Sequence, residues 1–521
     1  MQRELKNVSD LLSKNSINYI HYYAKNNERK ISFQQLLQDA GNLVSFFKQI
    51  GVKQDEAIGI CNVNSYEWLV VDLACIIGGY MTVVFDSNTE KEHIMFYVER
   101  LHIRMIYSDH LHSISDIWVF TSEDICNYSQ KKMDLDTTVI DPSDWFTVVF
   151  TSGTTGIPKA IVLKRTSIEH TINTAMACME VLKDDCNLSF LPLSIFTTRM
   201  YIYGAYLFGY NVVLTTPDFL WLALAKYRPT IMQGVPYFFE NYAHLFKKRI
   251  QENFLRRLSF AINKWLNTYK MPNSLAWTYK AARLRFGNRM RFMITGAAPI
   301  SAETVQFYVD AGLDLLESYG LNETGIISTN LPFERKVGSV GKVLDGYEIK
   351  IDPDGRILVR SDYFWTDGYL TSDGLVRLEI DSDGFFCTGD VGHLDKEGFL
   401  FVTGRMNDVI LLKNGKKINP AEVEKVLNSF PPIGQSLVFS NDQNTVSALL
   451  VLNITYAEKD AAYCIRKFNR ENIFDITIRK FLIIQEGFSF DNGMLNTNLK
   501  LNRRKITETY LKSFEQEKGK L

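Results

Sequence analysis

The sequence has little of what would direct a chain to nucleic acid, to a membrane interior or to secretion. Its 58 Lys and Arg residues are balanced by 59 Asp and Glu residues, so no overall attraction to nucleic acid is expected. The longest apolar runs, such as 73–85, are too short to span a bilayer. The first residues, MQRELKNVSDLLSKN, are charged and have no apolar stretch of the signal-peptide kind.

Cysteine is also sparse. The seven cysteines are an odd number without a C-x-x-C pair, which argues against a disulfide framework and against a cysteine zinc site. The chain shows no fixed-period repeat and no low-complexity tract. Together these absences predict reduced thiols in a cytoplasmic globular protein.

Apolar residues, in contrast, are plentiful enough for several cores. A chain of 521 residues that is 46% hydrophobic is too long for one ordinary domain. Before residue 120 the pattern alternates: Ser32 caps a helix, and 56–62, 65–79 and 81–85 follow as strand, helix and strand. This rhythm predicts an α/β fold with a largely parallel sheet. Segments 338–360 and 384–401 alternate with Asp-Gly turns and predict a β-meander.

A loop of hydroxyls and glycines follows an apolar strand expected over 145–150. The loop and its lysine are Thr151, Ser152, Gly153, Thr154, Thr155, Gly156 and Lys159. Glycines let backbone N–H groups approach a ligand, the hydroxyls add donors and the lysine adds positive charge. This combination predicts a polyphosphate cradle, although the spacing is not that of a P-loop. On composition alone, a flexible hairpin turn remains the alternative.

The full string FTSGTTGIPK at 150–159 resembles the phosphate-loop signature TSGTTGxPKG of the adenylate-forming superfamily. That superfamily includes acyl-CoA synthetases, luciferases and peptide-synthetase adenylation domains. Here Ala160 replaces the last glycine. Further motifs follow in the family's order up to residue 504, most similar in pattern to long-chain fatty acyl-CoA synthetases. The resemblance implies a large adenylating (AMP-binding) domain over 1–406, built of α/β subdomains plus a β-meander. A small mobile α+β domain, carrying the catalytic lysine, is expected over 407–521.

The resemblance also implies a nucleotide and metal site. The residues expected to bind the nucleotide beside the loop are Gly296, Ala297, Ala298, Pro299, Ser318, Tyr319, Gly320, Asn322 and Asp390. The turn at 296–299 would border the adenine, and Tyr319 would stack on it. Asp390 of the TGD motif would accept both ribose hydroxyls. Glu323 would hold Mg²⁺ between phosphate oxygens. Asn322 replaces the family's threonine.

Four residues are expected at or beyond the domain boundary. Arg405 would contact ribose or phosphate, and Asn407 occupies the hinge position that is usually Asp or Lys in the family. Gly415 lies where relatives line the pantetheine passage. Lys500, within NGMLNTNLKLNRR, corresponds to the catalytic lysine that would bridge the carboxylate and the α-phosphate.

Three segments resemble parts of the family that concern the acyl group. LSFLPLSIFTTRM at 188–200 resembles the family's segment near the acyl group, with Ile195 in place of the usual histidine. GVP at 234–236 resembles a wall of the acyl tunnel, with a plain strand–turn–helix junction as the alternative. The basic stretch 244–291 resembles the insertion of long-chain enzymes. Such a stretch can contact an anionic membrane surface, although a solvated helical hairpin is the more common case.

The implied function is ATP-dependent activation of a medium- or long-chain fatty acid to an acyl-adenylate, with release of pyrophosphate and transfer to CoA. The cofactors would be ATP, Mg²⁺ and CoA, or the phosphopantetheine of a carrier protein. The expected partner is a small-molecule carboxylic acid, and no nucleic acid is expected. Three alternatives stay open: an acyl-carrier-protein synthetase, an aryl-acid ligase and a binding protein without catalysis.

Overall fold

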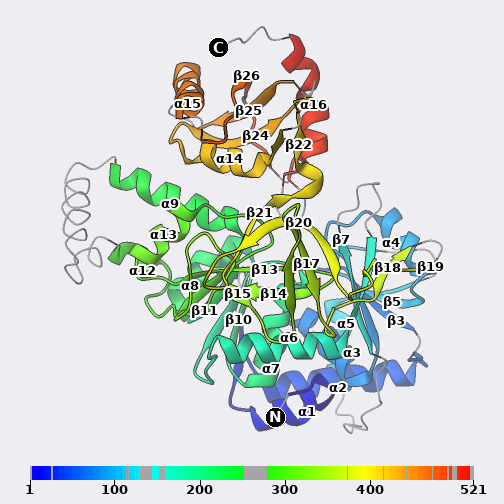
Figure 1. The fold of residues 1–521 in the computed structure, drawn as a ribbon. Coiled ribbons are helices and arrows are strands. Elements are labelled where there is room, and N and C mark those ends of the chain that lie inside the picture. Colours follow the sequence, from blue (N-terminus) through cyan, green and yellow to red (C-terminus); the bar gives the residue numbers. More distant parts are fainter. Residues whose placement is uncertain are drawn as a thin grey trace.

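The computed structural model describes residues 3–24, 27–54, 56–112, 114, 117–129, 144–151, 159–251, 279–371, 374–414, 416–440, 444–453, 456–471, 473–489, 492–495 and 501–516. In Figure 1 these residues form a large N-terminal part and a smaller C-terminal part, which lies beyond the end of strand β21.

One large sheet contains the strand that leads into the glycine-rich loop. Its order over the described residues is β19-β18-β8-β7-β4-β3-β5-β6. Strands β3 to β7 run parallel, as the alternating pattern predicts, and β8 returns antiparallel to β7. The strands are β3 (Ala57–Ile60), β4 (Met81–Val84), β5 (Ile103–Tyr107), β6 (Trp118–Phe120), β7 (Trp145–Thr151), β8 (Lys159–Lys164), β18 (Gly368–Thr371) and β19 (Gly374–Arg377).

A second large sheet has the order β15-β14-β13-β12-β11-β9-β10-β1-β2 over the described residues. Its centre, from β1 through β10, β9, β11 and β12 to β13, is parallel, so the carboxyl ends of these strands meet at one edge. The strands are β1 (Tyr19–Ala24), β2 (Asn27–Ser32), β9 (Cys186–Ser189), β10 (Asn211–Thr215), β11 (Ile231–Gly234), β12 (Phe292–Thr295), β13 (Leu315–Leu321), β14 (Gly325–Thr329) and β15 (Lys342–Val343).

Helices fill the space between the two sheets and cover their outer faces. The largest core cluster joins Ile60 of the first sheet to Leu214 of the second through helices α2, α3, α6 and α7. Helices α8, α9, α12 and α13 cover the other face of the second sheet. The helices of this part are α1 (Val8–Lys14), α2 (Phe33–Gln49), α3 (Tyr66–Gly78), α4 (Lys91–Val98), α5 (Ser122–Ser129), α6 (Arg165–Cys178), α7 (Phe196–Phe208), α8 (Leu220–Tyr227), α9 (Pro236–Gln251), α12 (Lys280–Arg285) and α13 (Ala302–Asp310), with short 3-10 turns at Leu5–Asn7 and Pro217–Phe219.

A buried ion pair holds the strand before the loop against the helices. Arg199 of α7 lies 2.7 Å from Asp72 of α3 and donates to the hydroxyl of Thr147 on β7 over 3.0 Å. Burial raises the pKa of the Asp72 carboxyl, and the Arg199 guanidinium opposes that rise. The arginine of the 188–200 segment therefore lies in the core, where it fixes β7.

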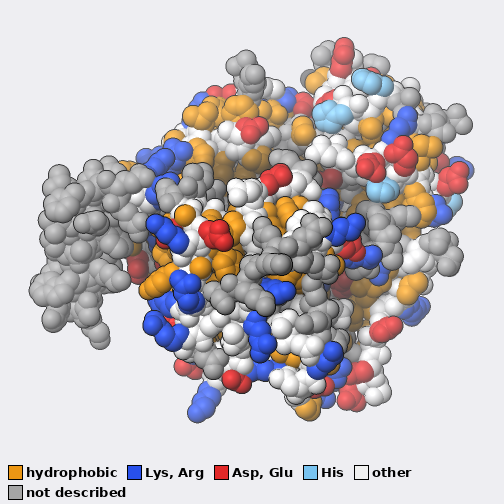
Figure 2. All heavy atoms as spheres, turned by 90° about the horizontal axis from the view of Figure 1, so that it is seen from above, with side chains coloured by type: hydrophobic (Ala, Val, Ile, Leu, Met, Phe, Trp, Pro, Cys, Tyr) orange, Lys and Arg blue, Asp and Glu red, His pale blue; other side chains and the backbone are white. Residues whose placement is uncertain are grey.

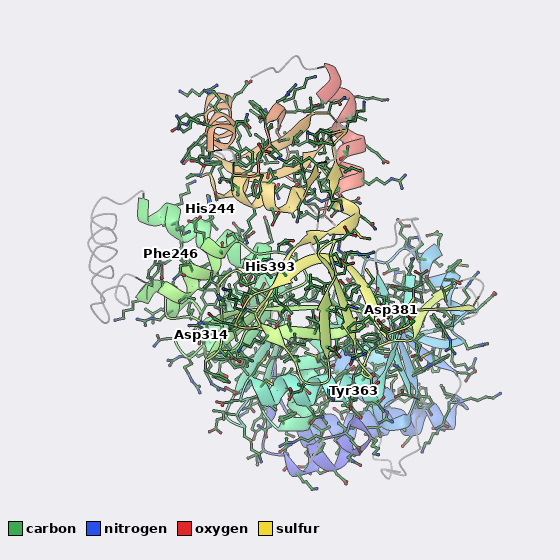
Figure 3. All side chains as sticks on the ribbon, in the orientation of Figure 1. His244, Phe246, Asp314, Tyr363, Asp381 and His393 are labelled. Carbon is green, nitrogen blue, oxygen red and sulfur yellow. The ribbon has the colours of Figure 1, made fainter. Side chains whose placement is uncertain are left out.

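The antiparallel β-meander connects the large part to the small one. Strands β16 (Glu348–Ile351), β17 (Arg356–Arg360), β20 (Phe386–Leu394) and β21 (Leu400–Arg405) pair in that order. Gly355 and Gly384 have φ of 80° and 85°, as the predicted Asp-Gly turns require. Tyr363 lies over α6 (Figure 3), where its ring stacks on His170 with the two centroids 3.5 Å apart. This contact ties the meander to the large part.

The small part is an α+β unit. Helices α14 (Pro420–Ser429) and α15 (Glu458–Glu471) pack on one face of a three-stranded sheet, and α16 (Arg503–Gln516) packs on the other. The sheet consists of β24 (Ile433–Phe439), β25 (Val446–Leu452) and β26 (Ile478–Ile484). A 3-10 turn, Met406–Asp408, and the hairpin β22 (Ile410–Leu411) with β23 (Lys417–Ile418) precede it.

The predicted fold class is confirmed, down to several element boundaries. Ser32 caps α2 by accepting from the backbone N–H of Gln35 over 3.1 Å. Tyr319 and Gly320 belong to strand β13. Among the described residues no helix combines the length and the apolarity needed to cross a bilayer.

Candidate active site

The glycine-rich loop joins two antiparallel strands at the edge of the first large sheet. Thr151 ends β7 directly opposite Lys159, which begins β8. Residues of the expected site that lie outside the described part of the chain are Ser152, Gly153, Thr154, Thr155, Gly156, Gly415 and Lys500. The backbone register therefore fixes where the loop starts and ends, as the sequence predicts.

Lys159 and Glu323 lie on either side of one tyrosine. The ammonium of Lys159 lies 4.9 Å from the centre of the Tyr369 ring. The hydroxyl of Tyr369 donates to an oxygen of Glu323 over 2.7 Å. Burial, followed by the Glu323 charge, raises the pKa of Tyr369, so the phenol stays protonated and remains a donor. The loop lysine and the proposed metal carboxylate are thus brought together.

Tyr369 was not found from the sequence. It comes from β18, which pairs with β8 so that Tyr369 lies opposite Ile161. Nothing in the local string around Tyr369 signals this pairing, because the two strands are about 200 residues apart. A functional tyrosine of this kind becomes visible only once the sheet order is known.

The donor set at Glu323 suits Mg²⁺. No group of three His, Cys, Asp or Glu side chains able to hold a metal occurs among the described residues. Mg²⁺ does not need one, because it keeps several waters and is usually bound by one or two carboxylates plus substrate phosphates. A single carboxylate beside a phosphate loop fits that preference.

Asp390 is held by two residues that the sequence analysis assigned to the nucleotide. It lies on β20 opposite Arg405 of β21, with 3.1 Å between the Arg405 Nε and a carboxylate oxygen. The hydroxyl of Tyr319 donates to the other oxygen over 2.8 Å. Burial, followed by the Asp390 charge, raises the pKa of Tyr319, so it donates at neutral pH. Asp390 is 5% exposed, and its fixed carboxylate can accept a pair of neighbouring hydroxyls.

The turn at 296–299 approaches β13 closely. A Cβ on Gly296 would lie 2.7 Å from the carbonyl oxygen of Ser318, so only glycine fits there. Ala297 has φ of 66°, an unusual value for a residue with a side chain. Ala298 and Pro299 complete the turn ahead of α13. The start of the turn therefore packs directly on the backbone of Ser318.

Gly320 and Asn322 lie where β13 turns into β14. A Cβ on Gly320 would collide with the carbonyl oxygen of Gly325, so this position also requires glycine. Asn322 and Glu323 occupy the short connection between the strands. The β13–β14 hairpin therefore carries Ser318, Tyr319, Asn322 and Glu323 close together in the chain.

Glu317, which no motif singles out, lies beside the expected adenine turn. It lies on β13 opposite Thr295, the last residue of β12, beside the 296–299 turn. It is 7% exposed, and its Oε2 has no hydrogen-bond partner among the described residues. Burial raises the pKa of Glu317 to about 7, against the opposing effects of Lys425 and the Gly338 backbone N–H. An unpartnered buried acceptor of this kind costs free energy unless a ligand donor satisfies it.

The 188–200 segment is fixed by hydrogen bonds to neighbouring loops. Ser194 donates to Asp86 over 2.8 Å, and the backbone N–H of Leu193 donates to Asn64 over 2.9 Å. Ile195 precedes the first turn of α7. These bonds give the segment a defined conformation, while its contact with an acyl group stays a prediction.

The strand that carries Arg405 is in contact with the small part. Asn419, the N-cap of α14, donates to the carbonyl of Thr403, and a Cβ on Gly404 would collide with the Asn419 side chain. Asn407 lies between them in the 3-10 turn Met406–Asp408. The expected hinge therefore lies between two segments that touch.

A family model described as AMP-binding enzyme matches residues 13–370. The chain belongs to the AMP-binding enzyme family. A second model, described as AMP-binding enzyme C-terminal domain, matches residues 407–472 of this family member. The expected family resemblance is confirmed, and the boundary between 406 and 407 stays a prediction.

Curated relatives and solved structures agree with this assignment. The AMP-binding enzyme is 27% identical to the long-chain-fatty-acid–CoA ligase FadD15 of Mycobacterium tuberculosis, over 89% of this chain and 88% of the relative. It is 24% identical to the human long-chain-fatty-acid–CoA ligase ACSBG1, over 94% and 81% of the two chains. Its fold is similar to ATP-bound MatB from Rhodopseudomonas palustris, with a TM-score of 0.77, 20% identity and coverage of 97% and 99%. The o-succinylbenzoate CoA synthetase of Bacillus subtilis is also similar, with a TM-score of 0.74, 20% identity and coverage of 98% and 99%.

Proposed function

We propose that this AMP-binding enzyme activates a medium- or long-chain fatty acid with ATP and transfers the acyl group to the thiol of CoA. The acid and the thiol are supported by the names of its relatives, long-chain-fatty-acid–CoA ligases that align over most of both chains. The observation that carries the nucleotide half is the buried Asp390 carboxylate held between Tyr319 and Arg405. A fixed carboxylate of this kind is suited to a ribose diol.

In the first half-reaction an oxygen of the fatty carboxylate attacks the α-phosphorus of ATP, and pyrophosphate leaves. The barrier is charge crowding, so fixed positive charge is the main requirement. Lys500 would lie between the carboxylate and the α-phosphate, while Lys159 and the 151–156 loop hold the β- and γ-phosphates. Mg²⁺, held by Glu323, would neutralise phosphate charge when bound. Tyr369 would orient Glu323 for that purpose.

The adenine and ribose would be bound by groups of the large part. The 296–299 turn would border the adenine, and Tyr319 would stack on it while donating to Asp390. We add Glu317 to this set, because its unpartnered Oε2 can accept from an exocyclic amine. Adenine carries an exocyclic amine on C6, whereas guanine carries a carbonyl on C6.

In the second half-reaction the thiol sulfur attacks the acyl carbonyl, and AMP leaves with the C–O bond electrons. Rotation about Asn407 would withdraw Lys500 and bring Gly415 to the thiol passage, which is a hinge motion between domains. A phosphopantetheine thiol on a carrier protein would react in the same way. CoA and a carrier protein would therefore differ only in the part of each molecule that lies outside the thiol passage.

The test is acid-dependent exchange of labelled pyrophosphate into ATP, measured over a series of fatty acids and an aryl acid. Exchange is expected with medium or long fatty acids and not with the aryl acid. Thioester formation is then compared between CoA and a holo carrier protein, with CoA expected as the better acceptor. Absence of exchange with every acid would contradict the enzymatic proposal, and a preference for the aryl acid would redirect it.

A second proposal concerns the surface at which the enzyme would encounter its fatty-acid substrate. The basic stretch 244–291, partly outside the described residues, would contact anionic membrane at the periphery. Lys280 and Arg285 are exposed there, beside the exposed apolar Leu245 and Leu284. Lys and Arg side chains gather along this left side of the molecule in Figure 2.

The two described ends of this stretch lie next to each other. The ring of Phe246 on α9 (Figure 3) stacks on Tyr279, just before α12, with the centroids 6.0 Å apart. Cosedimentation with phosphatidylglycerol-containing vesicles is expected at low salt and is expected to fall with K280E/R285E. Equal binding to neutral phosphatidylcholine vesicles would contradict this proposal.

A further inference from the structure

A cavity of about 420 Å³ lies at the edge of the second large sheet that is opposite to the adenine turn. The 296–299 turn follows the carboxyl end of β12, whereas the cavity lies at the amino ends of the parallel strands β9 and β10. The cavity is therefore separate from the candidate active site. Its lining residues are His21, Asp184, Cys186, Asn211, Tyr227 and Arg289.

Two of the lining residues carry rings that lie against each other. His21 on β1 and Tyr227 at the end of α8 have ring centroids 4.9 Å apart, with 39° between the ring planes. Glu28 fixes the Tyr227 ring by accepting from its hydroxyl over 2.8 Å. Burial, followed by the charge of Lys30, lowers the pKa of His21, so its ring is neutral at neutral pH. This pair of rings offers a surface on which a flat aromatic group can pack.

Two other lining residues have opposite charges that are not paired with each other. Asp184 and Arg289 are both exposed, and neither forms a salt bridge or a side-chain hydrogen bond among the described residues. Their neighbours in the chain do pair, because Asp185 forms a salt bridge with Arg291. Asp185 also accepts from the hydroxyl of Thr230 over 2.6 Å. One positive and one negative group therefore remain available to a ligand in this cavity.

The last two lining residues are uncharged. The side-chain oxygen of Asn211 accepts from the backbone N–H of Tyr19 over 2.9 Å, which leaves its NH₂ group as the donor for a ligand. Burial raises the pKa of Cys186 to about 12, so its thiol stays protonated. No set of three metal-ligating side chains occurs in the described part of the chain, so a metal ion is not the expected occupant.

We propose that this cavity is a second ligand site, which takes a small zwitterion with a flat ring, of the aromatic amino acid type. Arg289 would bind the carboxylate, since a guanidinium can donate two parallel hydrogen bonds to it. Asp184 would accept from the ammonium group, and the ring would pack on His21 and Tyr227. A simple anion would leave Asp184 without a partner, and a simple cation would leave Arg289 without one.

The size of the cavity and its separation from the nucleotide support this assignment. A volume of about 420 Å³ lies within the range of small-molecule sites. No lining residue belongs to the set that we assign to ATP, the acid or the thiol. The inference therefore does not depend on the proposed function, and it stands or falls on binding alone.

The test is calorimetry on the full chain, with L-tryptophan as the probe and AMP present to fill the nucleotide site. We expect a dissociation constant of about 1 mM or below. Tryptamine lacks the carboxylate and indole-3-propionate lacks the ammonium group, and each should bind at least about tenfold more weakly. L-alanine lacks the ring and should also bind more weakly.

Substitutions at the two charges connect the binding to this cavity. Arg289→Ala and Asp184→Asn should each weaken L-tryptophan binding at least about tenfold. Arg289→Ala should also lose the preference over tryptamine, and Asp184→Asn the preference over indole-3-propionate. Arg466→Ala removes an exposed arginine of the small part, on α15, and is the control that should bind like the wild type. Without ligand, all three variants should unfold at the wild-type temperature.

Three results would overturn the inference. The first is the absence of L-tryptophan binding up to about 10 mM. The second is unchanged binding in both Arg289→Ala and Asp184→Asn, which would place the amino acid elsewhere, including the acyl site. The third is equal binding of L-tryptophan and indole-3-propionate, which would exclude a zwitterion as the ligand class.

Discussion

The hydroxyl of Tyr369 donates to Glu323 over 2.7 Å, and the face of the same ring lies 4.9 Å from the ammonium of Lys159. One side chain thereby contacts both a cation at the start of β8 and a carboxylate in the connection between β13 and β14. If Glu323 holds Mg²⁺ and Lys159 holds the terminal phosphates, Tyr369 orients both groups for the same pyrophosphate.

Tyr369→Phe should weaken Mg²⁺ activation while leaving ATP affinity nearly unchanged. It removes the hydrogen bond that orients Glu323 and keeps the ring beneath Lys159. Loss of such a supporting partner typically costs about 10- to 100-fold in metal affinity. The measurement is the Mg²⁺ concentration for half-maximal pyrophosphate exchange. Tyr363→Phe, on a tyrosine that stacks on His170, is the matched control and should have no effect. An unchanged Mg²⁺ requirement in Tyr369→Phe would contradict the role.

Asp390→Asn should abolish discrimination between ATP and 2′-deoxy-ATP. The carboxylate is placed to accept both ribose hydroxyls, and a neutral amide oxygen accepts more weakly. We expect the KM for ATP to rise about 10-fold or more, since hydrogen bonds to charged groups contribute roughly 1.5–3 kcal/mol. The KM for 2′-deoxy-ATP should change much less. Asp395→Asn, at the far end of the same hairpin beside Lys336, is the control. Retained preference for ATP in Asp390→Asn would place the ribose elsewhere.

Lys500→Ala should lose pyrophosphate exchange and still bind ATP. The lysine would act on charge that develops as the carboxylate approaches the α-phosphate, and loss of one such group typically lowers the rate about 100- to 1000-fold. Exchange rate and ATP affinity by calorimetry are measured on the same preparation. Lys512→Ala, an exposed lysine on α16, should leave both unchanged. Normal pyrophosphate exchange in Lys500→Ala would mean that another residue supplies the positive charge at the α-phosphate.

Glu317→Gln should flatten the dependence of stability on pH. Burial raises the pKa of Glu317 from 4.5 to about 7, so its stabilising contribution is fully present below about pH 4.5 and is lost as the pH rises through about 7. The amide keeps the shape but does not ionise. At pH 8 the variant should therefore be more stable than the wild type, by up to about 3 kcal/mol.

Urea unfolding at pH 5 and pH 8 measures this difference, and bound nucleotide must be absent. Glu303→Gln, on a side chain that is 62% exposed and paired with Lys247, is the control and should follow the wild type at both pH values. If Glu317→Gln loses the same stability as the wild type between pH 5 and pH 8, another group governs the profile.

The parts of the fold that the sequence predicts are those decided locally. Ser32 caps a helix as predicted, and the helix expected over 65–79 is present as α3, with Ser65 as its N-cap. The apolar run before the glycine-rich loop forms β7 with nearly the expected bounds. Asp390 and Arg405, assigned by resemblance, lie opposite each other because consecutive strands of a meander pair directly.

What the sequence does not reveal depends on distant pairing or on burial. Tyr369 reaches Glu323 only because β18 crosses over to pair with β8. Glu317 reads as an ordinary acidic residue, and its burial follows from its place on β13 beside β12. Tyr319 was expected to stack on adenine, and its hydroxyl bond to Asp390 is a contact that stacking alone does not suggest.

Asn419 and Gly404 have a mechanical consequence for the order of the two half-reactions. Any turn of the small part about Asn407 must separate Asn419 from the Thr403 carbonyl, two residues before Arg405 on the same strand. The contact of Asn419 with Thr403 and that of Arg405 with Asp390 therefore lie on the same short stretch of β21. Substrate exchange in this enzyme would begin with a single backbone carbonyl giving up its side-chain partner.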